Sequence, residues 1–353
     1  MEAVLLFIKR NFKEKMKAIQ IIEKGKTGIV EVDEPVLISG HVLLKIGYVG
    51  FCGSDLNTFR GLNPLVKLPI IPGHEIGARI EAVGEGVPKT LQPGMNATVN
   101  PYTSCGQCPA CDNGRPNSCE YNQTLGVQRD GAMSEYLIVP WEKVIADAAI
   151  SVRDFTLVEP MSVGFHAVSR AKVTDVDTVM VIGCGMIGVG AIVRSVLRGA
   201  KVIAVDVDEK KLVLAKHLGS QYVINSARED LHECVMQITG KRGADAIIEA
   251  VGCPDTYLAS ISEAAFTGRV VYIGYAKGEI PFDTQFFVKK ELDIRGSRNA
   301  MPADFKAVME YMKQGTCPVE KLITAVYPPE KAQVALEEWS IRPSDVFRIL
   351  IQF

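Results

Sequence analysis

The stretch Val179-Met180-Val181-Ile182-Gly183-Cys184-Gly185-Met186-Ile187-Gly188 decides the fold of the second half of the chain. Its apolar start is typical of a buried strand, and the periodic apolar residues from about Met186 to Arg198 are typical of a helix. Between them stands G-x-G-x-x-G, whose glycines allow a tight turn, close approach of the backbone to a pyrophosphate, and close packing of helix on strand. The helix start also offers free N–H groups to phosphates. We therefore expect a dinucleotide to bind here, against Gly183, Gly185, Met186, Ile187 and Gly188.

A carboxylate follows at the distance that this kind of site requires. Asp206 ends the next expected strand, Lys201–Asp206, eighteen residues after Gly188. A carboxylate there accepts hydrogen bonds from ribose hydroxyls and repels a 2′-phosphate, which favours NAD over NADP. Lys211 leaves NADP open, because a cation can accept a phosphate. Later strands end at the same sheet edge, and there we expect further cofactor contacts from Val251 and Gly274.

The chain divides into two parts of different character. Up to Glu159-Pro160, short strands alternate with Gly and Pro punctuation, which predicts a barrel-like antiparallel domain. These strands are expected at Ala18–Ile22, Val42–Val49, Ala78–Val83, Asn96–Asn100 and Ser134–Val139. Beyond that point apolar strands alternate with amphipathic helices, which predicts an α/β fold with a doubly wound parallel sheet. We place this dinucleotide-binding domain at 163–298 and the first domain at 1–162 with 299–353. Residues 1–15 are expected to be an extension, and Phe347–Phe353 to be a strand that returns to the first domain.

Length and charge exclude several kinds of partner. The chain has 353 residues, 47% of them hydrophobic and 23% charged, with a net charge of −2. Such a balance gives no electrostatic case for nucleic acid or an anionic membrane. The apolar run near the start, Ala3–Ile8, is far shorter than the roughly 20 residues that span a bilayer. We expect a cytoplasmic protein that acts on a small molecule.

Four of the nine cysteines stand within fifteen residues. Cys105, Cys108, Cys111 and Cys119 follow the spacing C-x2-C-x2-C-x7-C on a loop rich in Gly and Pro. Four thiolates in such a loop (105–119) enclose one tetrahedral zinc and leave no position open for a substrate. The site is therefore expected to be structural. An iron–sulfur cluster is a competing occupant of the same ligand set.

Three separated motifs carry the remaining ligand-type side chains. They are Cys52 in Gly50-Phe51-Cys52-Gly53-Ser54-Asp55, His74-Glu75 after Pro72-Gly73, and Glu159 before Pro160. Together they offer sulfur, nitrogen and oxygen to a metal and leave a fourth position for water or substrate. Taken singly, each is equally compatible with a buried or solvated structural residue. The residues alone leave the choice open.

The order of these motifs resembles that of the zinc-containing medium-chain dehydrogenases, over residues 16–353. The resemblance implies a GroES-like catalytic domain around an inserted Rossmann domain, and a homodimer or homotetramer. It implies Cys52, His74 and Glu159 as ligands of a catalytic zinc, with Glu75 as an alternating ligand and Ser54 as the start of a proton relay. Together with the four-cysteine loop this gives two zincs per chain. The implied reaction transfers a hydride from a secondary alcohol to NAD+.

The expected substrate is a sugar acid or polyol. Glu159 stands where alcohol dehydrogenases of this family carry a third Cys and polyol dehydrogenases carry Glu. The segments Arg60–Pro64 and Gly296–Pro302 resemble the branch that contains L-galactonate and L-gulonate 5-dehydrogenases. Arg298 matches a substrate-contacting position, and Arg129 is a second candidate, because a guanidinium suits vicinal hydroxyls or a carboxylate. Alternatives are a sorbitol or L-threonine dehydrogenase, a zinc-free NADPH reductase, and a non-catalytic NAD- or zinc-binding protein.

Overall fold

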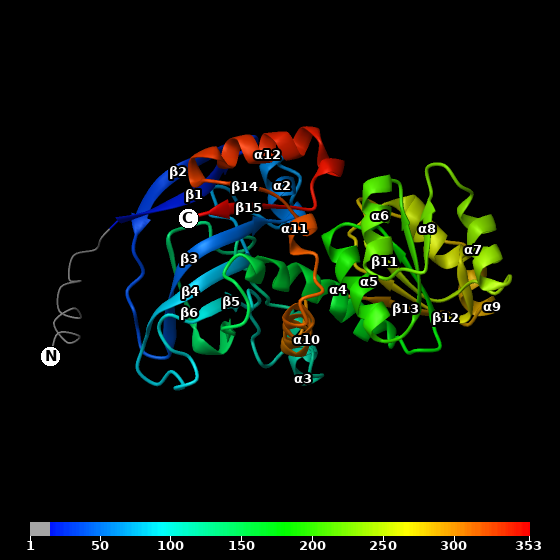
Figure 1. Cartoon of the computed structure of the whole chain (residues 1–353), viewed down its shortest axis with the longest axis horizontal. Coiled ribbons are helices and arrows are strands. Elements are labelled where there is room, and N and C mark those ends of the chain that lie inside the picture. Colours follow the sequence, from blue (N-terminus) through cyan, green and yellow to red (C-terminus); the bar gives the residue numbers. More distant parts are fainter. Residues whose placement is uncertain (1–14) are drawn as a thin grey trace. The chain divides into compact units, whose positions relative to one another are not determined.

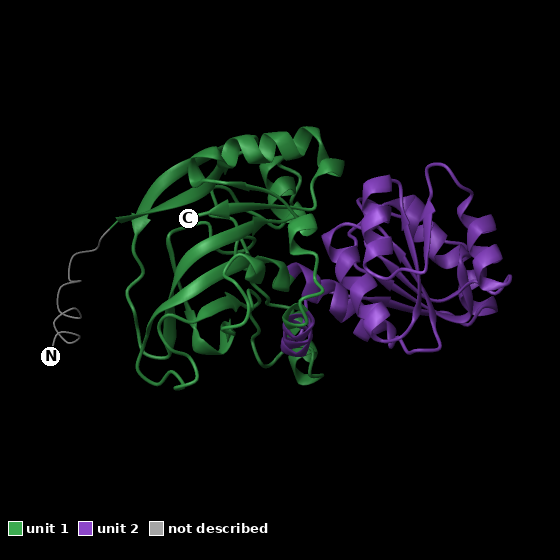
Figure 2. Cartoon of the chain, in the orientation of Figure 1, with its two compact units in different colours: residues 1–159, 312–353 green, residues 160–311 purple. Residues whose placement is uncertain are grey.

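The computed structural model describes residues 15–353, so the expected extension lies, apart from Lys15, outside the described residues. The chain forms two compact units: a first unit of residues 1–159 and 312–353, and a second unit of residues 160–311 (Figures 1 and 2). The sequence placed these boundaries at 162/163 and 298/299, whereas the structure groups 160–162 and 299–311 with the second unit. The boundaries that the sequence suggested for the two functional domains stay a prediction. Within residues 15–353 no helix has both the length and the apolar character needed to cross a bilayer.

The first unit is built from an antiparallel hairpin and a seven-stranded sheet. The hairpin joins β1 (Lys15–Glu23) to β2 (Lys26–Asp33). The larger sheet has the order β14-β15-β3-β4-β5-β7, with β6 paired to β3, and only β14 and β15 pair in parallel. Its strands are β3 (His41–Phe51), β4 (Glu75–Val83), β5 (Asn96–Val99), β6 (Tyr136–Pro140), β7 (Val144–Ala146), β14 (Ile323–Tyr327) and β15 (Arg348–Gln352). The antiparallel prediction is confirmed, and β15 is the expected returning strand; β14 was not expected.

Short helices complete this unit. They are α2 (Gly53–Phe59), α3 (Pro109–Asp112), α11 (Val319–Leu322) and α12 (Ala332–Ile341). Helix α2 begins directly after β3, and α3 lies inside the four-cysteine loop. Two further helices cross a boundary between the units: α4 (Val158–Ala171) and α10 (Pro302–Lys313).

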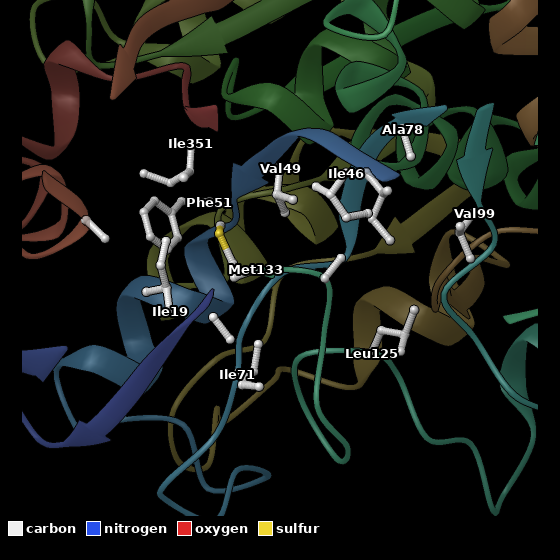
Figure 3. Close-up of a cluster of buried hydrophobic side chains, with 14 of the residues drawn as sticks. Ile19, Ile46, Val49, Phe51, Ile71, Ala78, Val99, Leu125, Met133 and Ile351 are labelled. Atoms are coloured by element: carbon white, nitrogen blue, oxygen red, sulfur yellow. The ribbon is translucent and has the colours of Figure 1, made fainter. Parts of the chain in front are cut away.

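The core of the first unit holds the strands that lead to the polar motifs. Val49 and Phe51 of β3 have no exposed surface, and Figure 3 shows Phe51 beside Ile351 of β15, with Met133 nearby. Burying a side chain of this size stabilises the fold by roughly 1.5–3 kcal/mol. The core therefore fixes the end of β3, and with it the position of Cys52, the next residue.

Strand register brings three distant segments to one end of the sheet. Gly50 of β3 pairs with Glu75, the first residue of β4, in antiparallel register. Phe51 pairs with Ile349 near the start of β15. In an antiparallel pair one strand ends where its partner begins. Cys52, His74 and Arg348 therefore lie at the same end of these strands. Pairing between residues hundreds of positions apart thus assembles the site.

The second unit contains a six-stranded parallel sheet of order β10-β9-β8-β11-β12-β13. Its strands are β8 (Thr178–Ile182), β9 (Lys201–Asp206), β10 (Tyr222–Asn225), β11 (Ala244–Glu249), β12 (Ala264–Tyr272) and β13 (Asp293–Gly296). Its helices are α5 (Met186–Leu197), α6 (Glu209–His217), α7 (Leu231–Thr239), α8 (Pro254–Ser262) and α9 (Gln285–Lys289), with most of α4 and α10. The doubly wound prediction is confirmed.

Both faces of this sheet are buried. In β8, Val179 and Val181 belong to one apolar cluster, while Met180 and Ile182 belong to another. Alternate residues of a strand point to opposite faces, so a strand covered on both sides needs a continuous apolar run. The strand order reverses between β8 and β11, and ligands of such sheets bind at the carboxyl ends of the strands at that point.

Candidate active site and metal sites

The structure brings together three of the four residues expected at a catalytic metal. One ligand atom from each of Cys52, His74 and Glu75 lies within 4.8 Å of the other two. Cys52 follows β3, His74 precedes β4 and Glu75 begins it, so the strand register described above places all three. His74 is 5% exposed and Glu75 is fully buried.

Several polar atoms of these side chains are buried without a hydrogen-bond partner, as expected of metal ligands. Nδ1 of His74 and both carboxylate oxygens of Glu75 are buried and have no hydrogen-bond partner. Leaving such atoms unpaired costs about 1–3 kcal/mol each, and more for a charged group. A cation would satisfy them, and a set of sulfur, nitrogen and oxygen donors suits zinc. The residues present therefore fit a zinc ion.

The charges of this group act strongly on one another. Burial raises the pKa of Glu75 well above its ordinary value, although the Arg348 guanidinium opposes the shift. Burial lowers the pKa of His74, but Cys52, Asp55 and Glu159 outweigh it and hold that pKa well above normal. Burial likewise raises the pKa of Cys52, yet contact with His74 and the charge of Arg348 bring it below normal. A bound divalent cation would relieve the repulsion among these anions.

Arg348 completes the group and was missed by the sequence reasoning. Its Nε lies 3.0 Å from Oε2 of Glu75, and its Nη1 donates to the carbonyl of Phe51 at 2.6 Å. The residue is only 3% exposed. A lone arginine in the apolar segment Phe347–Phe353 was the one available signal, because a buried charge in a strand requires a partner.

Glu159 lies near this group but outside it. It stands in the first turn of α4 and is 5% exposed. The hydroxyl of Tyr102, a residue that sequence reasoning also missed, donates to Oε1 of Glu159. Burial and the Glu159 charge raise the pKa of Tyr102 well above its ordinary value, so the hydroxyl stays a donor. The charge of Glu159 acts on both His74 and Glu75.

Ser54 has the freedom expected of a group that handles a proton. Its Oγ is buried and has no hydrogen-bond partner. It lies in the first turn of α2, whose start is fixed because the backbone N–H of Cys52 donates to Oδ2 of Asp55 at 2.8 Å. A hydroxyl both accepts and donates, so Ser54 Oγ can pass on a proton.

The four cysteines of the 105–119 loop converge on one point. Their sulfurs lie within 4.8 Å of one another. Sγ of Cys108 lies 3.6 Å from that of Cys111 and 3.8 Å from that of Cys119. Disulfides need about 2.05 Å, whereas four sulfurs around one zinc at about 2.3 Å stand about 3.8 Å apart. The spacing fits a single tetrahedral ion, and it is too small to enclose the several irons of a cluster.

Backbone N–H groups donate hydrogen bonds to these sulfurs and stabilise the thiolate form. The N–H of Cys105 donates to Sγ of Cys119 at 3.3 Å. Backbone donors at Glu120 and Cys111 lower the pKa of Cys108 to about 6, whereas burial raises the pKa of Cys111 to about 11. Thiolates are the metal-binding form of cysteine, so the loop already favours it at one ligand.

The glycine-rich turn of the second unit has the geometry that the sequence predicted. Gly183 has φ 93°, and a side chain on it would meet Val251 at 2.6 Å. A Cβ on Gly188 would lie 1.8 Å from the carbonyl oxygen of Gly183, so helix and strand could not approach with any other residue there. Gly185 precedes Met186 and Ile187, the first residues of α5, and has open space beside it for a ligand.

Asp206 ties this turn to the next strand. Its Oδ2 accepts from the N–H of Cys184 at 2.7 Å, and its Oδ1 accepts from the N–H of Asp208 at 3.0 Å. Lys211 lies in the first turn of the following helix, α6, with its backbone N–H bound to Asp208. The carboxylate expected at the ribose is thus at the carboxyl end of β9, beside the glycine turn.

A second buried acid, Glu249, was missed. It is fully buried at the end of β11, and its Oε1 accepts from the N–H groups of Val251 and Gly252 at 2.9 and 2.8 Å. Gly274 packs so closely that a side chain on it would touch Gly252 at 2.3 Å. Glu249 therefore shapes the edge at which Val251 and Gly274 were expected to meet the cofactor.

The two candidate substrate residues lie in different units. Arg298 is half-buried in the segment after β13, in the second unit. Arg129 is half-buried in the first unit, and its Nε is shielded from solvent without a hydrogen-bond partner. Their roles stay predictions.

One unit holds two clusters of metal-ligand side chains, and the other holds a sheet whose glycine turn suits a dinucleotide. This combination is typical of oxidoreductases that use a metal and a nicotinamide cofactor. Residues 38–149 match the alcohol dehydrogenase GroES-like domain, and residues 187–314 match the zinc-binding dehydrogenase family. The chain belongs to the zinc-containing medium-chain dehydrogenases, as its motifs predicted. It is an oxidoreductase that depends on zinc and a nicotinamide cofactor.

Similar proteins act on polyols and sugar acids. L-Galactonate-5-dehydrogenase of Escherichia coli K12 is 33% identical over 297 residues, which cover 83% of this chain and 86% of that protein. Sorbitol dehydrogenase of Bacillus subtilis 168 is 31% identical over 331 residues, covering 92% and 93%. A solved structure of the alcohol dehydrogenase rspB from Escherichia coli CFT073, in complex with NADH, is 30% identical. It has a TM-score of 0.88 and covers 96% of this chain and 99% of its own.

Gly50→Ala is expected to remove the metal at Cys52 and His74 while sparing the four-cysteine site. A methyl group at Gly50 would lie 2.3 Å from Oε2 of Glu75 and would displace that carboxylate. Metal analysis should then fall from two zincs per chain to one. Gly53→Ala is the matched control, because its Cβ meets nothing within 4 Å. Two retained zincs in Gly50→Ala would show that Glu75 is not needed to hold this metal.

Cys119→Ser is expected to remove the other zinc. Because structural zinc sites contribute directly to folding, the Tm should fall by at least about 5 °C. Metal analysis and a thermal melt provide the measurements. Cys234→Ser, which lies outside both metal groups, should leave the zinc content and the Tm unchanged. An unaltered zinc content in Cys119→Ser would show that the loop does not hold the metal.

Proposed function

We propose that the protein oxidises a secondary alcohol of a sugar acid or polyol with NAD+, giving a keto product. The best candidate is the C5 hydroxyl of L-galactonate or L-gulonate. The observation that carries the proposal is the convergence of Cys52, His74 and Glu75, in which Nδ1 of His74 and both oxygens of Glu75 are buried without a hydrogen-bond partner. A closed structural site would have four such ligands, whereas this group of three has room for a substrate oxygen.

Two zincs per chain are proposed, with separate tasks. Cys105, Cys108, Cys111 and Cys119 would hold one, and Cys52, His74 and either Glu75 or Glu159 would hold the other. When bound, the second zinc supplies Lewis-acid polarisation of the substrate oxygen, and NAD+ supplies the hydride acceptor. The protein contributes the orientation of these groups and the exclusion of water.

Ser54 is proposed to receive the proton of the substrate hydroxyl. Its buried, unpartnered Oγ lies two residues from Cys52, so it has a free lone pair to accept the proton and a hydrogen to pass on. Arg348 holds the Glu75 carboxylate in place through their ion pair.

NAD is proposed in preference to NADP because of the Asp206 carboxylate. A 2′-phosphate beside it would bring like charges together. Substituting Asp206→Asn removes that repulsion, so the preference for NAD+ over NADP+, measured as the ratio of kcat/KM values, should fall at least roughly tenfold. Asp230→Asn changes a helix-capping carboxylate in the same unit and should leave the ratio unchanged. An unchanged ratio in Asp206→Asn would disprove this role.

The choice of a sugar acid is supported by charge as well as by the relatives. Within the described residues the side chain of Arg129 has no hydrogen bond or ion pair, and burial lowers its pKa. A half-buried guanidinium of this kind favours an anionic partner such as a substrate carboxylate. Arg298 is proposed as a second contact, from its place after β13.

A screen of NAD+ reduction should separate the alternatives. L-Galactonate and L-gulonate are expected to give the highest kcat/KM, above sorbitol and L-threonine. Turnover of sorbitol alone would favour a polyol dehydrogenase, and turnover of L-threonine alone a threonine dehydrogenase. If zinc-loaded protein reduced no NAD+ with any of them but bound NADH, the non-catalytic alternative would gain.

The variant Arg129→Met tests whether Arg129 binds the carboxylate of the substrate. Loss of a charge-assisted contact should raise KM for the hexonates at least roughly tenfold and leave KM for sorbitol nearly unchanged. Equal effects on both substrates would rule out a carboxylate-specific role.

The expected cytoplasmic location and the homodimeric or homotetrameric state also stay predictions.

A further inference from the structure

Tyr102 is held in place independently of the carboxylate that it contacts. Its backbone N–H donates to Oδ1 of Asn100 at 3.2 Å, and its carbonyl accepts from Nζ of Lys143 at 2.7 Å. The side chain is 4% exposed. Its hydroxyl donates to Oε1 of Glu159, which is itself 5% exposed. The phenol is therefore a fixed donor, and the carboxylate is the partner that it holds.

The neighbourhood of Tyr102 adds to this rigidity. The N–H of Leu125 donates to the carbonyl of Pro101 at 3.1 Å, and the N–H of Gln123 donates to Oγ1 of Thr103 at 2.6 Å. These bonds join the chain just before the four-cysteine loop to the chain just after it. Cys105 follows Tyr102 by only three residues. A filled four-cysteine site would thus tighten the segment that carries the phenol.

The hydrogen bond from Tyr102 orients the carboxylate of Glu159. An ionised carboxylate only accepts hydrogen bonds, so a fixed donor at Oε1 determines the direction in which the carboxylate is turned. Bonds from a hydroxyl to a charged oxygen are among the stronger ones in proteins. Glu159 is not in the group of ligand atoms formed by Cys52, His74 and Glu75.

We propose that Tyr102 is a positioning residue that holds Glu159 out of the resting zinc ligand set, leaving Glu75 to complete it with Cys52 and His74. The proposal rests on the catalytic zinc site proposed above. Its consequence is a coordination position that stays open to water or substrate. Without the hydroxyl, the Glu159 carboxylate would lose the donor that orients it at Oε1, and it could turn to bind zinc and close that position.

The test compares Tyr102→Phe with the parent protein, each loaded with zinc or with Co2+ at the Cys52 site. The visible spectrum of Co2+ reports the number of ligands, and transfer of zinc to a chelator reports how tightly the site is closed. In Tyr102→Phe we expect an altered Co2+ spectrum, zinc release slowed roughly tenfold, and kcat lowered by a similar factor.

Two controls separate this effect from general damage. Tyr327→Phe removes another phenol–carboxylate bond, to Glu338, in an exposed part of the same unit, and should change none of the three readouts. Tyr102→Phe combined with Glu159→Gln should behave as Glu159→Gln alone, because the hydroxyl acts only through that carboxylate.

The outcomes distinguish failure of this inference from failure of the site. If the parent protein binds no metal at Cys52 and His74, the proposed active site itself is wrong. If the parent binds zinc but Tyr102→Phe leaves spectrum and release unchanged, or speeds the release, Tyr102 does not withhold Glu159. Additive effects of the two substitutions would also overturn the proposal.

Discussion

The ion pair between Arg348 and Glu75 is the interaction on which the active site depends. Both residues are almost wholly buried, where an isolated charge would cost several kcal/mol. The two come from opposite ends of the sequence and meet only because β15 and β4 both pair with β3. Cys52 as a thiolate and Glu75 as a carboxylate place two anionic ligands beside one guanidinium, and Asp55 and Glu159 lie close enough for their charges to act on His74. A divalent cation would balance the charge of the two anionic ligands. The buried charges are thus arranged for a bound metal.

Features that depend on local sequence were predictable, and features that depend on register were not. The glycine turn at Gly183–Gly188 and the cysteine spacing are local, because each site forms from one short segment. The apolar runs likewise revealed the parallel sheet, since a strand covered on both faces carries its own signature. Tyr102 gave no such signal, and Arg348 gave only that of a lone charge in an apolar strand, because the roles of both residues arise only when β15 or the segment after β5 meets distant residues. Cys52, His74 and Glu159 fell between these cases: their chemistry was visible, but only family resemblance joined them. Even then the structure separates Glu159, bound to Tyr102, from the other three ligand-type side chains.

Buried acids have two different tasks in this chain. Glu249 accepts hydrogen bonds from two successive backbone N–H groups, and that pairing fixes the loop at the end of β11. Its charge is spread over backbone donors, as at an anion-binding turn. Glu75 has a guanidinium on one side but no hydrogen-bond donor, so its coordination is incomplete within the protein. The contrast is one of degree: Oε1 of Glu249 is held by backbone donors while its buried Oε2 has no hydrogen-bond partner, whereas neither oxygen of Glu75 accepts a hydrogen bond.

The charge of the ligands explains why the two cysteine-containing sites differ in burial. Four thiolates around one zinc leave a net charge of −2, which would be costly in a core. The loop meets this by placing two of its cysteines at partly exposed positions and by aiming backbone N–H groups at the sulfurs. The group at Cys52 has only two anionic ligands, Cys52 and Glu75, so a zinc ion together with these ligands would be neutral and can lie inside the fold. A nearly neutral, water-poor site strengthens every charge that develops during reaction. Donor composition therefore decides which of the two sites can be buried, and burial decides which can perform chemistry.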